Sequence, residues 1–176
     1  MDTIAHGLWG GVAFGRRHFF WAFLLGAAPD LIAFGPFFFR WALMGFPSYP
    51  KAPGLNAPAL EAMPSYVFAA YNVTHSLVIW TAVFLLLFLL FRRPVWIFCA
   101  WVLHILCDIP THITRYFPTP FLWPFPTPYV EGIPWSRPWF LIVNYLLLGL
   151  SFGIWFWFRR RSKRMVEGKT QAQELS

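Results

Sequence analysis

Residues 65–91 read SYVFAAYNVTHSLVIWTAVFLLLFLLF and are followed at once by Arg92, Arg93 and Pro94. The run contains no Asp, Glu, Lys or Arg. A helix needs about 20 apolar residues to cross a hydrocarbon core of ~30 Å, and this run is longer than that. It therefore predicts a membrane-spanning helix that ends at the two arginines, and it sets the fold class for the rest of the chain.

The overall composition agrees with this prediction. Apolar residues make up 58% of the chain and charged residues only 12%, whereas soluble domains hold about 25% charged residues because their surfaces face water. The formal net charge of +7 comes mostly from arginine pairs between apolar runs and from the basic segment 159–164. Basic residues of this kind flank membrane spans on the cytoplasmic side, so we expect no nucleic-acid partner.

Four long apolar segments and one short segment organise the chain. The predicted full spans are His18–Met44, Ser65–Phe91, Val95–Phe117 and Trp139–Phe158, and Met1–Gly15 predicts a short N-terminal helix. Proline-rich stretches between the spans predict loops. We therefore expect an all-α fold, a polytopic transmembrane helix bundle with about four full spans.

The basic residues predict the orientation of the spans. If the ends at Arg16, Arg92 and Arg159 are cytoplasmic, ten of the fourteen Lys and Arg residues lie inside, as the positive-inside rule requires. We expect a multi-pass protein of a bacterial or archaeal cytoplasmic (inner) membrane. Residues 1–158 would form the membrane domain, and residues 159–176 a basic, disordered cytoplasmic tail.

The polar residues inside the apolar segments form a second pattern. They comprise all three aspartates and four of the five histidines: Asp2, Asp30, Asp108, His6, His75, His104 and His112. A charged side chain at mid-bilayer costs at least ~2.5–3.5 kcal/mol, so such residues usually face a functional site in the bundle interior. A rise of ~1.5 Å per residue from the cytoplasmic arginines places all seven ~15–29 Å deep. We expect them to meet in one slab in the outer half of the bilayer.

Spacing along the fourth segment adds detail. His104, Asp108 and His112 follow one another at intervals of four residues, which places them on one helix face. In a regular helix the two histidines would lie ~12 Å apart, too far for one ion with bonds of ~2 Å. Pro110 removes a helical hydrogen bond, so His112 is free to serve a second metal ion or the substrate.

Imidazole and carboxylate groups in one slab favour a divalent metal ion, zinc above all. We expect its ligands to come from Asp2, His6, Asp30, His75, His104 and Asp108. Taken singly, several of these residues also suit structural roles: Asp2 is equally suited to cap a helix, a lone buried histidine such as His75 is more often only hydrogen-bonded, and Asp30 suits a turn. Intramembrane Asp and His also serve proton or ion pathways.

Five short motifs follow one another over residues 1–125: Met1-Asp-Thr-Ile-Ala-His6, Pro29-Asp30, Thr74-His75-Ser76-Leu77, His104-Ile-Leu-Cys-Asp108 and Phe121-Leu-Trp-Pro-Phe125. This series resembles the predicted membrane-bound metal-dependent hydrolases, an inner-membrane family that includes LexA-controlled members. Two positions depart from that pattern. Ile32 stands where the family often has a second Asp, and Asn72 stands where an Arg often precedes the Thr-His-Ser motif.

The order of these residues is also similar to that of zinc-dependent phospholipase C. That resemblance implies that one or two zinc ions are held by His6, Asp30, His75, His104 and Asp108, with Asp108 able to bridge two ions. The later H-x-x-x-E pair of that enzyme has no counterpart here, so we do not expect a full trinuclear site.

Together the resemblances imply hydrolysis of a phosphoester or related bond in a lipid or lipid-linked substrate. A bound divalent ion lowers the pKa of its water towards ~7. Asp30 would act as general base if it is not itself a ligand, and His112 would protonate the leaving group. Arg115 and Arg137 would either clamp a phosphate or extend to lipid headgroups.

Two other classes of function stay open on the sequence. A proton- or cation-coupled transporter would use Asp30 and Asp108 as carriers, although the chain has no duplicated half that would favour this class. A non-catalytic membrane scaffold would recruit a partner through its basic tail.

Overall fold

The computed structural model describes residues 1–15, 17–55 and 57–174, and all regular structure in these residues is helical. The elements are α1 (Thr3–Phe14), α2 (Phe19–Leu43), η1 (Leu60–Ala62), α3 (Ser65–Thr74), α4 (Leu77–Phe91), η2 (Trp96–Phe98), α5 (Cys99–Asp108) and α6 (Pro138–Glu174). Isolated β-bridges join Lys51 to Pro58 and Ile113 to Tyr116 in the loops. The predicted all-α class is confirmed.

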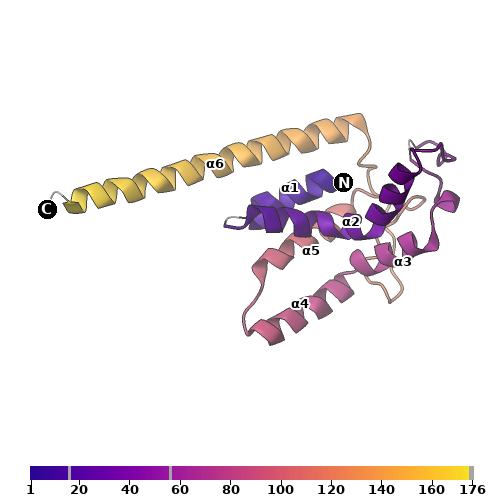
Figure 1. Cartoon of the computed structure of the whole chain (residues 1–176), viewed down its shortest axis with the longest axis horizontal. Coiled ribbons are helices and arrows are strands. Elements are labelled where there is room, and N and C mark those ends of the chain that lie inside the picture. The colour runs from indigo at the N-terminus through magenta and orange to yellow at the C-terminus, as the bar shows by residue number, and fades with distance from the viewer. Residues whose placement is uncertain (16, 56, 175–176) are drawn as a thin grey trace.

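Helices α1, α2 and α5 pack together at the centre of the molecule (Figure 1). The backbones of α1 and α2 are nearly in contact, because a Cβ added to Gly26 would lie only 2.6 Å from the carbonyl oxygen of His6. A Cβ added to Gly10 would lie 2.8 Å from the carbonyl oxygen of Ala22. Small residues allow such close approach in membrane bundles. The contact holds the His6 end of α1 against the middle of α2.

The segment predicted as one span over Ser65–Phe91 is broken in two. α3 and α4 meet at a bend of 59°, and the break lies at His75 and Ser76, between the two helices. The Ser76 hydroxyl caps α4 by accepting from the Ile79 amide (3.2 Å) and donates to the carbonyl oxygen of Trp123. The Leu77 amide donates to the carbonyl oxygen of Phe121 (2.9 Å). The loop after α5 therefore bonds to the break through the Leu77 amide and the Ser76 hydroxyl.

Fewer helices can span a membrane than the four predicted. Among the described residues two helices are long and apolar enough, Phe19–Leu43 and Pro138–Arg161, and a third span is present if the bent α3–α4 pair counts as one. The predicted span Val95–Phe117 yields only the short apolar helix Trp96–Asp108, which is ~20 Å long at 1.5 Å per residue. It ends where Pro110 removes a backbone donor and the chain turns.

Two helices bury almost none of their apolar surface. α4 has no buried residue, and only 11% of the most apolar stretch of α6 is buried. Leucines at positions 89, 90, 146 and 150 are each at least 60% exposed. Exposure of apolar surface to water costs about 25 cal/mol per Å², and contiguous surface of this kind marks a membrane or partner contact. The helices therefore indicate membrane association.

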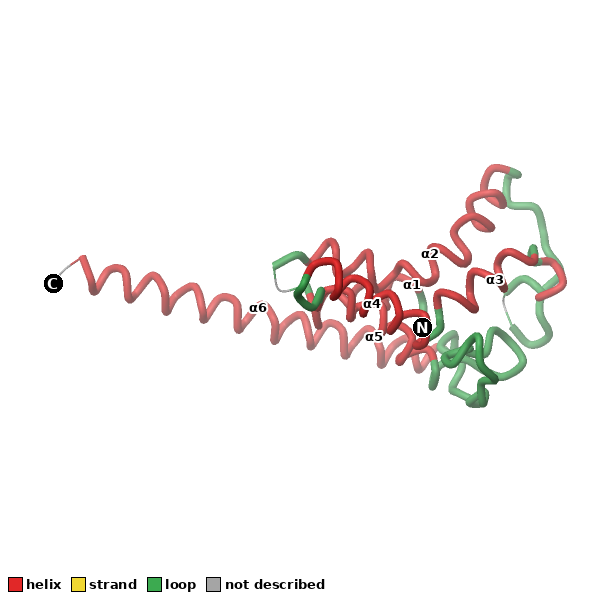
Figure 2. The backbone as a smooth tube through the Cα atoms, turned by 90° about the horizontal axis from the view of Figure 1, so that it is seen from below, coloured by secondary structure: helices red, strands yellow, loops and turns green. Residues whose placement is uncertain are grey.

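Polar contacts attach α6 to α1 near the start of α6. The indole N–H of Trp9 donates to Oδ1 of Asn144 (2.9 Å), and the hydroxyl of Tyr145 donates to Oδ1 of Asp2 (3.0 Å). Beyond this region α6 projects past the rest of the molecule as a single long helix (Figures 1 and 2). The helix runs to Glu174, and no proline after Pro138 interrupts it. The disorder expected for the basic tail over residues 159–176 stays a prediction.

An aromatic cluster connects α2, α3 and the segment after α5. Its buried members are Ala33, Phe37, Met63, Val67, Tyr71 and Phe117. Phe117 has a positive φ of 48°, a conformation that is uncommon for a bulky residue. The Tyr71 hydroxyl donates to the carbonyl oxygen of Phe117 (2.9 Å). The cluster thus fixes the direction of the Phe117 carbonyl group.

Candidate metal centre

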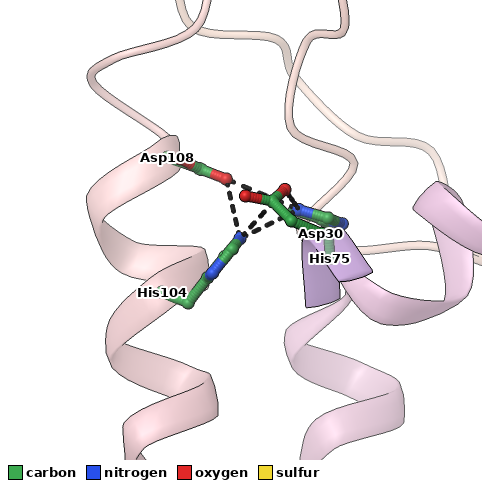
Figure 3. Close-up of side chains that lie close together, drawn as sticks. All are labelled: Asp30, His75, His104 and Asp108. Atoms are coloured by element: carbon green, nitrogen blue, oxygen red, sulfur yellow. Dashed lines mark hydrogen bonds and ion pairs between the residues drawn. The ribbon is translucent and has the colours of Figure 1, made fainter. Parts of the chain in front are cut away.

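Four polar side chains from three parts of the chain meet inside the bundle. They are Asp30 from α2, His75 from the break between α3 and α4, and His104 and Asp108 from α5. Each offers one ligand atom, and the four atoms lie within 4.8 Å of one another (Figure 3). All four residues are buried, with Asp108 and His75 fully enclosed. We call these residues the four-residue group.

Backbone carbonyl groups set the protonation of both histidines in this group. Nδ1 of His104 lies 2.7 Å from the carbonyl oxygen of Gly26, and Nδ1 of His75 lies 3.1 Å from that of Tyr71. A carbonyl oxygen can only accept a hydrogen bond, so each Nδ1 carries the proton. Each Nε2 then has a free lone pair, which is the form of imidazole that binds metal ions.

The distances within the group fit the ligands of one ion. The two Nε2 atoms are 3.1 Å apart. They lie 3.4 Å (His75) and 3.1 Å (His104) from Oδ2 of Asp108, and 3.6 and 3.7 Å from Oδ1 of Asp30. Two atoms bonded to zinc at 2.0–2.1 Å with a tetrahedral angle are about 3.3 Å apart. The group could therefore hold a metal ion.

The charges of the group also favour a bound cation. Two carboxylates and two imidazole lone pairs point at one another in a buried space, and Oδ2 of Asp108 has no hydrogen-bond partner among the described residues. His104 Nε2 is close to this oxygen, but in the tautomer described above it has no proton to donate. Buried charges are normally paired or coordinate metals. A divalent ion would neutralise both carboxylates at once.

Two further histidines lie on the other side of Asp108. Nε2 of His6 is 2.8 Å from Oδ1 of Asp108, and the His6 ring stacks on that of His104 with centroids 3.6 Å apart. Nε2 of His112 is 3.4 Å from the same oxygen, and its side chain is 12% exposed. The backbone amide of His112 still donates to the Asp108 carbonyl oxygen (3.0 Å), so His112 stays one turn from Asp108 and borders the four-residue group.

The structure does not bring Asp2 into the group. Its Oδ1 accepts from the Ala5 amide (2.9 Å), which caps α1, and from the Tyr145 hydroxyl. Arg115 and Arg137 are exposed. Arg115 lines a surface pocket with Glu61 and Tyr116, and Arg137 lies in the turn that precedes α6. None of the three residues contributes an atom to the four-residue group.

Three contacts to the site were missed by the sequence reasoning. The hydroxyl of Thr3 donates to Oδ2 of Asp30 (2.8 Å), and the amino nitrogen of Met1 lies 2.6 Å from Oδ1 of Asp108. The Tyr71 ring stacks on His75 with centroids 3.9 Å apart. Spacing could have suggested two of these, because Thr3 precedes His6 by three residues and Tyr71 precedes His75 by four, the intervals that share a helix face.

The loops beside the site are joined outside the spanning helices. The Tyr116 hydroxyl donates to the carbonyl oxygen of Pro58 (3.0 Å), and burial raises the pKa of Tyr116 to about 12. The hydroxyl and amide of Thr114 donate to the Glu131 carboxylate, and these bonds hold the pKa of Glu131 below its usual range. Tyr116 is therefore neutral and Glu131 ionised at neutral pH.

Comparisons of the chain with protein-family models, curated proteins and solved structures found no match. The resemblance to membrane-bound metal-dependent hydrolases therefore stays a prediction from the motifs. What the geometry establishes is narrower: a helical protein with helices apolar enough to cross a membrane, and a buried Asp/His group that could hold a metal ion.

Proposed function

We propose that this protein is a membrane-embedded, metal-dependent hydrolase that acts on a phosphoester or related bond of a lipid or lipid-linked substrate. The observation that carries the proposal is the four-residue group, in which two imidazole lone pairs and two carboxylates converge at ligand spacing. Imidazole and carboxylate ligands together suit zinc. When bound, such an ion would activate a water molecule and polarise a phosphoryl oxygen.

The surrounding residues have defined roles in this proposal. His75, His104 and Asp108 would hold the ion, and the carbonyl groups of Tyr71 and Gly26 keep both imidazoles in the required orientation. Asp30 is held by the Thr3 hydroxyl through Oδ2, which leaves Oδ1 for the ion or for the proton of the attacking water. His112 borders the group and is partly exposed, so it is placed to protonate a leaving group.

The substrate class follows from the surroundings of the site. Apolar, largely unburied helices flank the bundle, and this supports a substrate that reaches the site from the bilayer. We further propose the cytoplasmic (inner) membrane, with the basic end of α6 in the cytoplasm. Because Arg115 and Arg137 are exposed and lie outside the group, any contact they make would be with outlying phosphates or headgroups.

The proposal is tested first by the metal content of the protein and then by hydrolysis of a panel of lipids. Detergent-purified protein should contain stoichiometric zinc by elemental analysis, and His75→Ala should lose it. His18→Ala is the matched control, because His18 is exposed and lies outside the group. Phosphatidylglycerol, phosphatidylethanolamine and a polyprenyl phosphate are then incubated with the protein. Product that forms only without a chelator supports the hydrolase, whereas metal-free wild-type protein after gentle purification would reject it.

One observation favours a second candidate, a proton- or cation-coupled transporter. The α3–α4 pair is an apolar stretch bent by 59° with a buried His75 at the break, and discontinuous helices form ion sites in many transporters. Proteoliposomes separate the two candidates. Proton or Zn²⁺ flux that requires Asp30 and Asp108, with no product from any lipid of the panel, would favour the transporter over the hydrolase.

A further inference from the structure

We propose that a pocket between the loop after α2 and the loop after α5 binds the headgroup of a zwitterionic phospholipid, with Arg115 as the partner of its phosphate and Glu61 as the partner of its ammonium group. The pocket has a volume of about 230 Å³. Sites for drug-sized ligands are usually larger, ~300–1,000 Å³, so this pocket suits a headgroup rather than a whole lipid. Neither residue belongs to the four-residue group, so the inference does not depend on the proposed hydrolysis.

The pocket is built from an ordered hairpin after α2 and from the segment after α5. The hairpin is closed by a bond from the Ala59 amide to the carbonyl oxygen of Pro50 (2.7 Å). Tyr116 joins the two segments, because its hydroxyl donates to the carbonyl oxygen of Pro58 (3.0 Å). Ala52 and Ala59 line the pocket and are buried. These contacts hold the walls of the pocket in a fixed arrangement.

Two opposite charges line this pocket without forming an ion pair. Arg115 and Glu61 both line it and are both exposed, and none of the ion pairs among the described residues includes either side chain. The pKa of Glu131 is lowered by its bonds to Thr114 and also by the charge of Arg115, but its carboxylate accepts from Thr114. The pocket therefore offers a cation and an anion to one ligand at the same time.

The pocket lies beside the end of a helix that is apolar enough to cross a membrane. That helix, α2, ends at Leu43, and the hairpin follows a few residues later. Leu43 and Phe46 are 74% and 64% exposed, and the Trp41 indole donates to the carbonyl oxygen of Pro47 (2.7 Å). Tryptophan is enriched at membrane interfaces. Both loops lie at the end of the molecule opposite the C-terminal end of α6 (Figure 2), so the pocket is placed to meet lipid headgroups.

The two charges select among headgroups. A guanidinium binds phosphate oxygens through parallel N–H groups, and a carboxylate accepts hydrogen bonds from a primary ammonium group. Phosphatidylethanolamine carries both groups on one headgroup. Phosphatidylglycerol offers only the negative phosphate, and Glu61 would repel it. Free phosphoethanolamine has the same charges as the lipid headgroup, but it lacks the acyl chains that would lie beside the exposed apolar side chains of Leu43 and Phe46.

Lipid binding by the full chain tests this inference. Detergent-purified protein is titrated with phosphatidylethanolamine and phosphatidylglycerol of equal chain length, and bound lipid is counted by native mass spectrometry. We expect the wild type to bind phosphatidylethanolamine about fivefold more tightly, the effect of one favourable exposed ion pair. Glu61→Gln should remove this preference, and Arg115→Gln should weaken the binding of both lipids. Equal binding of the two lipids by the wild type, or a preference that survives Glu61→Gln, would overturn the inference.

A reversed preference guards against variants that fail to fold. Glu61→Lys should bind phosphatidylglycerol more tightly than phosphatidylethanolamine, a gain that unfolding cannot produce, and an unchanged preference in this variant would contradict the inference. Arg137→Ala is the matched control, because Arg137 is exposed and does not line the pocket, and it should keep the wild-type preference. Free phosphoethanolamine that binds as tightly as the lipid would overturn the assignment to a lipid. None of these results depends on zinc or hydrolysis, so the proposed function is left to its own test.

Discussion

Helix α6 and the α3–α4 pair are both long apolar stretches, but only one of them is continuous. The apolar part of α6 runs unbroken over Pro138–Arg161, whereas α3 and α4 meet at a bend of 59°. The apolar part of α6 contains no Asp, Glu or His, while the bend carries His75, which is fully buried. Of these two stretches, the one that contributes a ligand atom is interrupted at that residue, whereas Asp30 and His104 contribute theirs from within the regular helices α2 and α5.

The centre of the bundle around the four-residue group and helix α6 also differ in how tightly the backbone is enclosed. At Gly26, opposite His6, an added Cβ would meet a carbonyl oxygen at 2.6 Å, while at Gly149 and Gly153 in α6 nothing lies within 4 Å. Close packing around the polar centre holds the ligand atoms at fixed distances, as a metal site requires. α6 has no such requirement, so the same substitution should have opposite effects in the two regions.

The largest effect is expected from removing the charge of Asp108. Asp108→Asn keeps the shape of the side chain but removes the carboxylate that faces four histidines. Loss of a partner that only orients a ligand typically costs 10–100-fold in metal affinity, so loss of this ligand should cost more than about 100-fold. Zinc affinity is measured by competition with a chromophoric chelator.

Asn144→Ala is the matched control for Asp108→Asn. Asn144 is a buried polar residue of α6, bonded to Trp9, and it lies outside the four-residue group. Its substitution should leave zinc affinity unchanged. Equal loss of zinc in both variants would mean that the metal depends on general packing and would remove the contrast between the regions.

Gly26→Ala tests the packing contrast directly. The new methyl group would press on the carbonyl oxygen of His6, and overpacking of this kind costs ~1–3 kcal/mol. We expect a lower melting temperature and weaker zinc binding, since the Gly26 carbonyl also orients His104. Gly149→Ala should be neutral or stabilising by up to ~1 kcal/mol, because alanine is the better helix former. A neutral Gly26→Ala would contradict the close approach of α1 and α2.

Ser76→Ala should have a smaller effect at the break. It removes the cap of α4 and the bond to the Trp123 carbonyl group, and loss of a helix cap costs ~1 kcal/mol. Chemical denaturation in detergent measures the change. The matched variant Ser151→Ala lies within α6, where serine caps nothing, and should not destabilise. If Ser151→Ala is equally harmful, the cap at Ser76 has no special role.

The smallest effect concerns the loop between α5 and α6. Because hydrogen bonds from Thr114 lower the pKa of Glu131 in the folded state, ionised Glu131 stabilises the fold above its unfolded pKa of ~4.3. This contribution is lost as the pH falls through the lower, folded pKa. Wild type should therefore exceed Glu131→Gln slightly in melting temperature at pH 7, and the difference should vanish in acid. A difference that grows in acid would refute the assignment.

The sequence predicted the membrane class and the main polar residues of the site from simple rules. Residues 65–91 are apolar enough to indicate a span, and Asp30 and Asp108 lie in apolar segments where a charged side chain would be too costly without a role. Both aspartates are found in the four-residue group. Depth counting placed them near His75 and His104 even though it assumed straight, complete spans.

The break and the caps were beyond local sequence rules. Thr74, His75 and Ser76 include no proline or glycine, and their departure from helix depends on carbonyl groups of Phe121 and Trp123, which are distant in sequence. The ambiguity of Asp2 had a similar origin. A carboxylate at a helix start suits a cap and a metal ligand equally until the tertiary structure shows which atoms surround it.

X-ray absorption at the zinc edge of purified, zinc-loaded protein tests the central claim most directly. Ligation by the four-residue group predicts nitrogen and oxygen neighbours at ~2.0–2.1 Å, with the outer-shell scattering of imidazole rings, and this imidazole signal should weaken in His104→Ala. A shell with sulfur at ~2.3 Å, or zinc surrounded by water oxygens without imidazole, would contradict ligation by Asp30, His75, His104 and Asp108.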